Sequence, residues 1–133
     1  MMKIKDVEVK EGLLYKDNMW IRIDGNTATV GMTDAAAKRA KDIAFIELPN
    51  PDDAVALGKP FGNIESAKWA GEMVAPLSGK IKEVNSGLES SPDLINKDPF
   101  GKGWIIKIDM DDKKEAEGFL DHASYAKKLE KEL

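Results

Sequence analysis

Short apolar segments that end at glycine or proline corners recur through the middle of this chain. The clearest pair, MWIRID and TATVGM, covers residues 19–24 and 27–32 and flanks Asp24-Gly25-Asn26, which predicts a β-hairpin. Because short strands with frequent corners are typical of antiparallel sandwiches and barrels, we expect an all-β core. Further strands are expected within residues 44–49, 54–66, 72–85 and 104–109, interrupted by Gly58, Gly62, Pro76 and Gly79.

Helices are expected before and after most of these strands. Residues 33–44 begin with Thr33 or Asp34 as the capping residue and place Ala36, Ala40 and Ile43 at helical spacing. Residues 86–103 read as a loop, and the tail from about Asp111 turns helical. In that tail Ser124 is the expected N-cap, and apolar residues recur every four positions at Tyr125, Leu129 and Leu133.

Length and charge narrow the class of protein. At 133 residues the chain is long enough to bury one core, so a single domain over residues 1–133 is expected. With 20 Lys and Arg against 24 Asp and Glu the net charge is −4, which argues against nucleic-acid and anionic-membrane partners. The charged start MMKIKDVEVKEG lacks the apolar run of a signal peptide, so a cytoplasmic protein is expected. The absence of cysteine excludes disulfides and thiolate catalysis, and with the single histidine it excludes Cys- or His-rich metal sites.

Few residues suggest chemistry by themselves. Lys68 lies between Ala67 and Trp69 in FGNIESAKWAGEMVAP, with Glu65 three positions before it. A lysine is most simply a solvated surface residue, but an indole at an exposed hairpin tip usually has something to contact. Acidic residues supply candidate acids and bases for hydrolysis, but a third of the chain is charged, so such clusters arise freely. These acidic candidates are Glu47, Asp52, Asp53, Glu65 and Glu72.

An ordered set of motifs resembles the H-protein family of the glycine cleavage system from about Leu14 to the C-terminus. Typical members share a tryptophan-bearing first strand followed by GxTD, ExLP, ESxK, AP.SG..EVN and P.LIN.DP.G.GW. This chain has these motifs in the same order, beginning at Gly31, Glu47, Glu65, Ala75 and Pro92. The ordered set is far more specific than any one motif.

The resemblance implies that Lys68 carries lipoic acid in amide linkage, with Glu65, Ser66, Ala67 and Trp69 as the recognition residues around it. It also implies a lipoyl-type barrel-sandwich hybrid of two small antiparallel sheets. The lipoyl hairpin would span about residues 61–77 and the C-terminal helical segment about 112–133. In such a protein the reactive sulfurs belong to the cofactor, so the chain is expected to be a non-catalytic carrier. It is also expected to be a monomer and to bind no metal.

The partners implied are of two kinds. Glycine decarboxylase, aminomethyltransferase and dihydrolipoamide dehydrogenase would exchange the aminomethyl intermediate and electrons with the arm. A lipoate ligase or a lipoyl or octanoyl transferase would load it.

Two departures from the family pattern leave the cargo open. Asn18 and Met19 stand where typical members have His-Glu, so a carboxylate that helps to hold the cationic aminomethyl group is missing, while Glu72 remains as a cleft acid. Trp69 replaces the usual alanine after the modified lysine, which is closer to lipoate-binding proteins that carry sulfur intermediates for heterodisulfide-reductase-like complexes. An unmodified interaction or structural domain is the alternative of another class.

Overall fold

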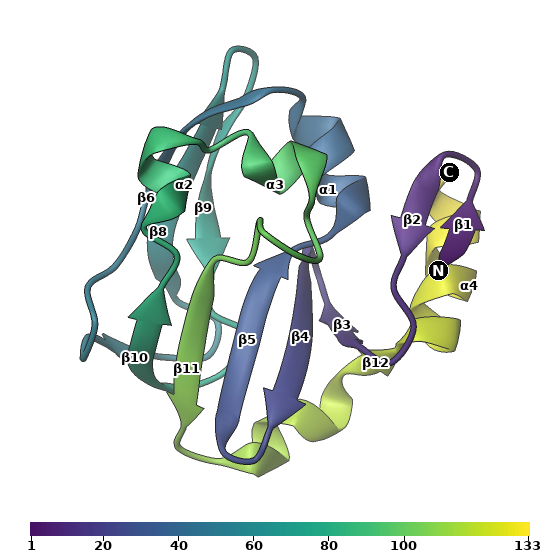
Figure 1. Cartoon of the computed structure of the whole chain (residues 1–133). Coiled ribbons are helices and arrows are strands. Elements are labelled where there is room, and N and C mark those ends of the chain that lie inside the picture. The colour runs from purple at the N-terminus through teal and green to yellow at the C-terminus, as the bar shows by residue number, and fades with distance from the viewer.

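The computed structural model describes all 133 residues and has an all-β core with flanking helices, as predicted (Figure 1). The strands are β1 (Met2–Ile4), β2 (Val7–Val9), β3 (Leu14–Lys16), β4 (Met19–Asp24), β5 (Thr27–Met32), β6 (Ile43–Glu47), β7 (Ala54–Val55), β8 (Pro60–Ser66), β9 (Ala70–Val74), β10 (Gly79–Val84), β11 (Ile106–Met110) and β12 (Leu120–Asp121). The helices are α1 (Asp34–Ala40), α2 (Gly87–Ser90), α3 (Leu94–Lys97), the 3-10 helix η1 (Lys113–Gly118) and α4 (His122–Glu132).

Antiparallel pairing organises the strands into one large and two small sheets. The large sheet has the order β12-β3-β4-β5-β11-β10-β7, and β6-β8-β9 form a second sheet. The predicted hairpin is confirmed as β4 and β5, with Met19 paired to Met32 and Asp24 to Thr27. Gly25 adopts a φ of +60° at the turn, a conformation that glycine reaches without steric cost.

One apolar core joins the two larger sheets. Ile21 and Val30 of the large sheet and Ile46 and Ile64 of the β6-β8-β9 sheet belong to the same cluster of 22 buried residues. Packing of two apolar sheet faces against each other is what holds a sandwich together, because each sheet has only one face to bury. The apolar residues of the alternating pattern seen in the sequence therefore face this core.

The early helix starts where expected but is shorter. The hydroxyl of Thr33 accepts a hydrogen bond from the Ala36 amide at 3.2 Å, which caps α1. The prediction that Ile43 continues the helical face is wrong, because α1 ends at Ala40 and Lys41 turns the chain with a φ of 64°. Ile43 instead begins β6 and is buried in the sandwich.

The segment expected as a loop, residues 86–103, contains the short helices α2 and α3. Each carries one apolar side chain that is fully buried in the main core, Leu88 in α2 and Ile95 in α3. Long-range burial therefore stabilises turns that are too short to be stable by themselves.

The C-terminal segment is helical as expected, but its cap differs. The prediction of Ser124 as N-cap is wrong, because the Ser124 amide donates to Oδ1 of Asp121 at 2.8 Å and Asp121 is the cap. Tyr125 stacks on Tyr15 with ring centroids 4.2 Å apart, and the β1-β2 hairpin lies beside α4 (Figure 1). None of the helices is long and apolar enough to span a membrane.

Candidate functional site

The β8-β9 hairpin presents Lys68 at its tip, and it extends beyond the rest of the strands in Figure 1. Its turn is closed by the Ser66 amide, which donates to the Trp69 carbonyl at 2.7 Å, so Ala67 and Lys68 lie at the outermost point. Lys68 is exposed and forms no hydrogen bond or ion pair within the chain. Its amine is therefore accessible to another molecule.

Alternation along the hairpin sorts the residues predicted around Lys68 onto two faces. Glu65 and Glu72 point outward, where Glu65 pairs across the strands with Phe45 and Ala70. Gly71 and Met73 lie on the inner face, and Met73 is buried. Glu65 and Lys68 are thus both accessible from outside.

A cleft of about 180 Å³ lies below the hairpin tip, between the hairpin and the β3-β4 turn; we call it the first cleft. Its floor is apolar and rich in thioether sulfur, with Met19, Met32 and Met73. Its rim carries two carboxylates, Asp17 and Glu72. Lys16 also lines the cleft, so its edge carries two acidic groups and one basic group around an apolar interior.

A second cleft adjoins the first on the side of α1. Its lining consists of Asn18, Met32, Ala36, Arg39, Ala40 and Trp69, of which Asn18, Met32 and Trp69 also line the first cleft. The guanidinium of Arg39 donates to Oδ1 of Asn18 at 2.8 Å. The lining of the second cleft consequently contains a positive group and no carboxylate.

The turn between β3 and β4 brings in a residue that the sequence analysis did not single out. Asp17 has a φ of 53° and lies on the first cleft, and the Thr33 amide donates to the neighbouring Asn18 carbonyl at 2.9 Å. The signal available in the sequence was the adjacent Asp-Asn pair, because both residues tolerate positive φ in turns. That signal indicates a turn but not the cleft it faces.

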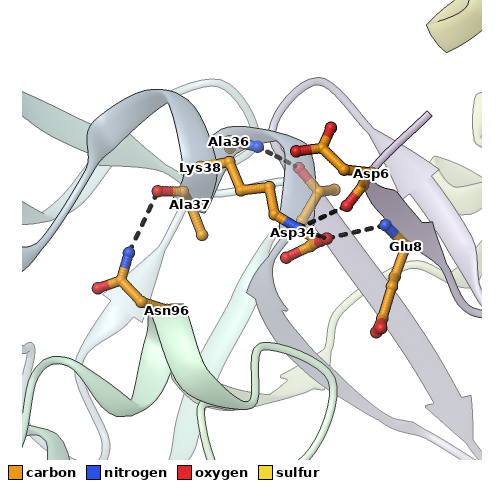
Figure 2. Close-up of polar contacts among 8 residues, drawn as sticks. Asp6, Glu8, Asp34, Ala36, Ala37, Lys38 and Asn96 are labelled. Carbon is orange, nitrogen blue, oxygen red and sulfur yellow. Dashed lines mark hydrogen bonds and ion pairs between the residues drawn. The ribbon is translucent and has the colours of Figure 1, made fainter. Parts of the chain in front are cut away.

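Figure 2 shows the polar contacts that hold the start of α1, the helix whose residues Ala36, Arg39 and Ala40 line the second cleft. Oδ2 of the buried Asp34 accepts from the Glu8 amide at 2.8 Å and pairs with Nζ of Lys38 at 3.0 Å. The same ammonium donates to the Asp6 carbonyl at 2.6 Å. The β1-β2 hairpin is thereby tied to the first turn of α1.

Contacts at the end of α1 come from α3. The side-chain amide of Asn96 donates to the carbonyls of Ala37 and Lys41 at 3.2 and 2.7 Å, and its oxygen accepts from the Ile43 amide at 2.9 Å. These bonds satisfy carbonyls that the helix end leaves unpaired. Both ends of the short helix are fixed, so the position of Arg39 relative to the hairpin tip is defined.

The two departures from the family pattern lie at the same cleft. Met19 is 6% exposed on its floor, and no carboxylate replaces the typical glutamate there. Trp69 is 42% exposed, and its ring folds back over Gly71, where an added Cβ would lie 2.6 Å from the indole. The indole thus faces the clefts as well as solvent.

Tyr15 and Tyr125 stack in the smaller buried cluster, apart from the residues that line the two clefts. Burial raises the pKa of both Tyr15 and Tyr125, so the stacked phenols stay un-ionised at neutral pH. No group of three or more acidic or histidine side chains is arranged to hold a metal ion. The charged residues that line the two clefts are Lys16, Asp17, Glu72 and Arg39.

Known proteins are similar to this chain in both sequence and fold. The family model described as Glycine cleavage H-protein matches residues 13–132. The chain is 44% identical to the glycine cleavage system H protein of Carboxydothermus hydrogenoformans, over 93% of this chain and 96% of that protein. It is 43% identical to the glycine cleavage system H protein 2, mitochondrial, of Arabidopsis thaliana, over 93% and 80% of the two chains. The crystal structure of a glycine cleavage system H protein from Mycobacterium marinum superposes with a TM-score of 0.83 at 29% identity, over 91% and 98% of the two chains.

Proposed function

Because this chain belongs to the glycine cleavage H-protein family, we propose that it is a lipoyl carrier whose arm is attached to Lys68. The observation that supports this attachment is the free, exposed amine at the tip of the β8-β9 hairpin. The ESxK motif that the family modifies also lies in that hairpin, with Glu65 and Ser66 at the end of β8.

The residues below the tip fit a lipoyl group. The arm is an aliphatic chain that ends in a five-membered ring with two sulfurs, and the first cleft offers an apolar floor of comparable chemistry. When attached, the lipoyl group would supply a disulfide that is reduced as it takes up the one-carbon unit, and the dithiol that remains after the unit is passed on must be reoxidised. The chain's own residues expose the amine, line the cleft that the arm can reach and supply carboxylates at its rim.

Tethering explains why a small carrier suffices. A group on a flexible arm reaches its acceptor at a high effective concentration, so the carrier need not bind each enzyme tightly. Acylating Lys68 also removes one positive charge from the hairpin tip next to Glu65 and Glu72. The resulting acidic surface suits transient, salt-sensitive docking.

The partners that follow are the glycine cleavage enzymes. We infer that the carrier, itself non-catalytic, exchanges its cargo with glycine decarboxylase and aminomethyltransferase and gives up electrons to dihydrolipoamide dehydrogenase. A lipoate ligase or lipoyl or octanoyl transferase attaches the lipoyl group in the cytoplasm. The relatives reported above carry the glycine cleavage name, which favours aminomethyl over sulfur cargo. Glycine–bicarbonate exchange with a matching decarboxylase separates the two cargoes, because a sulfur carrier supports little exchange.

Intact-mass measurement tests the attachment site. Protein from a lipoate-competent host should show the mass of one added lipoyl group, and Lys68→Ala and Lys68→Arg should lose it. Lys59→Arg is the matched control, since Lys59 is also exposed but lies outside the hairpin tip. An unmodified wild-type protein would instead support an interaction or structural domain.

A further inference from the structure

The indole next to the attachment lysine lies on the inner face of the hairpin. Residues 69, 71 and 73 share that face, because side chains alternate along a strand, and Met73 is buried in the core. Gly71 has no side chain, and the Trp69 ring occupies the space above it, with Cζ2 2.6 Å from where a Cβ would stand. The absence of a side chain at position 71 is therefore what lets the indole fold back.

The folded indole forms a wall common to both clefts. Trp69 and Met32 line the first cleft and the second cleft alike. The apolar surface thus continues from Met73 to Ala36 and passes directly beside the residue to which the arm is attached. A group on Lys68 meets this surface as soon as it bends back.

The apolar surface beside Trp69 suits a bound group made of sulfur and aliphatic carbon. Sulfur atoms make favourable contacts with aromatic rings, and aliphatic chains pack well against methionine. Neither contact requires a charge on the bound group. By contrast, the one buried position at which a typical member has a carboxylate for a cationic cargo is Met19.

We propose that Trp69 is a positioning residue for the arm, and that its indole together with Met32 seats the dithiolane ring in the first cleft even when the arm carries no cargo. This inference rests on the proposed attachment of lipoate to Lys68. The seat is apolar, so the unloaded arm spends much of its time folded against the chain. A cationic cargo then gains the additional attraction of Asp17 and Glu72 at the rim.

Tryptophan fluorescence measures this contact directly. The other two tryptophans, the buried Trp20 and the partly buried Trp104, emit in both proteins, so subtracting the spectrum of Trp69→Phe from that of wild type isolates the emission of Trp69. Attachment of oxidised lipoate should shift that emission to shorter wavelength and reduce its intensity, because the ring is covered and lies against a disulfide. Acrylamide should also quench Trp69 less in the lipoylated protein than in the unmodified protein.

A matched pair of glycine variants separates the seat from mere proximity. Gly71→Ala places a methyl group where the indole rests and displaces the ring, whereas Gly118→Ala adds a methyl group in open space. Gly118→Ala should keep the shift on lipoylation and Gly71→Ala should lose it, while intact mass shows both variants fully modified. If the wild-type protein is lipoylated but its Trp69 emission is unchanged, the proposed contact between the dithiolane ring and Trp69 is wrong while the proposed function stands. If Lys68 is not modified at all, both the proposed function and the proposed contact are wrong.

Discussion

Replacing Met19 by glutamate asks whether the floor of the first cleft determines how long a cationic cargo is retained. Met19 is 6% exposed, and its neighbours across the large sheet are Lys16 on β3 and Met32 on β5. A carboxylate at this position would lie inside the cleft, close to the path of the arm. It would restore the charge that typical family members have there.

Met19→Glu should change two free energies by similar amounts, the barrier to cargo release and the free energy of unfolding. A hydrogen bond between a carboxylate and an ammonium contributes about 1.5–3 kcal/mol, which slows release of the aminomethyl cargo by roughly 10- to 100-fold. Burying the new polar group costs the unloaded protein about 1–3 kcal/mol of unfolding free energy. Lys16, directly opposite on β3, offsets part of that cost as a cross-strand partner.

The assay loads lipoylated protein from glycine with a matching decarboxylase, removes the enzyme and follows the release of formaldehyde and ammonia with time. Met19→Gln is the control, because it has the same shape without the charge; it should lose stability in urea like Met19→Glu but slow release little. If Met19→Glu remains folded and lipoylated yet releases its cargo at the wild-type rate, the missing carboxylate is not the deficit, and the reasoning from position 19 is refuted.

Two further predictions concern the supports of the site. Asp34→Ala removes the acceptor of the Glu8 amide and the partner of Lys38, and should lower the free energy of unfolding in urea by about 2–3 kcal/mol. Lys38→Ala loses its bonds to Asp34 and to the Asp6 carbonyl but leaves the Glu8 amide on the carboxylate, so it should cost less, about 1–2 kcal/mol; a larger loss than that of Asp34→Ala would contradict this account. Burial raises the pKa of Tyr15 above its ordinary value of 10.0, so this tyrosine ionises at lower pH in the unfolded chain than in the folded one, and the free energy of unfolding should fall as the pH rises above about 10. Tyr15→Phe should reduce that loss in denaturation curves recorded at alkaline pH, and the part that remains is the contribution of Tyr125.

Features that depend on neighbouring residues could be predicted from the sequence. The β4-β5 hairpin follows from alternation around Gly25, and the start of α1 follows from the Thr33 cap, because both are decided within a few residues. The exposure of the hairpin tip at Lys68 also follows locally, from strands on either side of a short turn. The motif order then indicated the family, which the comparisons confirm.

Features that depend on distant residues could not be predicted from the sequence. Ser124 and Asp121 both suit an N-cap, and the choice was decided by β12, which pairs with β3 and holds Asp121 in extended conformation immediately before α4. The helices within residues 86–103 form because Leu88 and Ile95 find space in the sandwich. Local preferences are too weak to decide such cases without the core.

The sequence by itself predicted an exposed lysine between two strand-like segments, because strand patterns act over short distances, and the family resemblance implied that these segments form a hairpin. Only the tertiary structure decided what surrounds that lysine. Asp17 comes from the turn between β3 and β4, Met19 from β4 and Met32 from β5, and they meet Trp69 only because the two sheets pack face to face. The direction of the Trp69 ring depends on the bare backbone at Gly71 and on the space between the sheets, which no local pattern encodes.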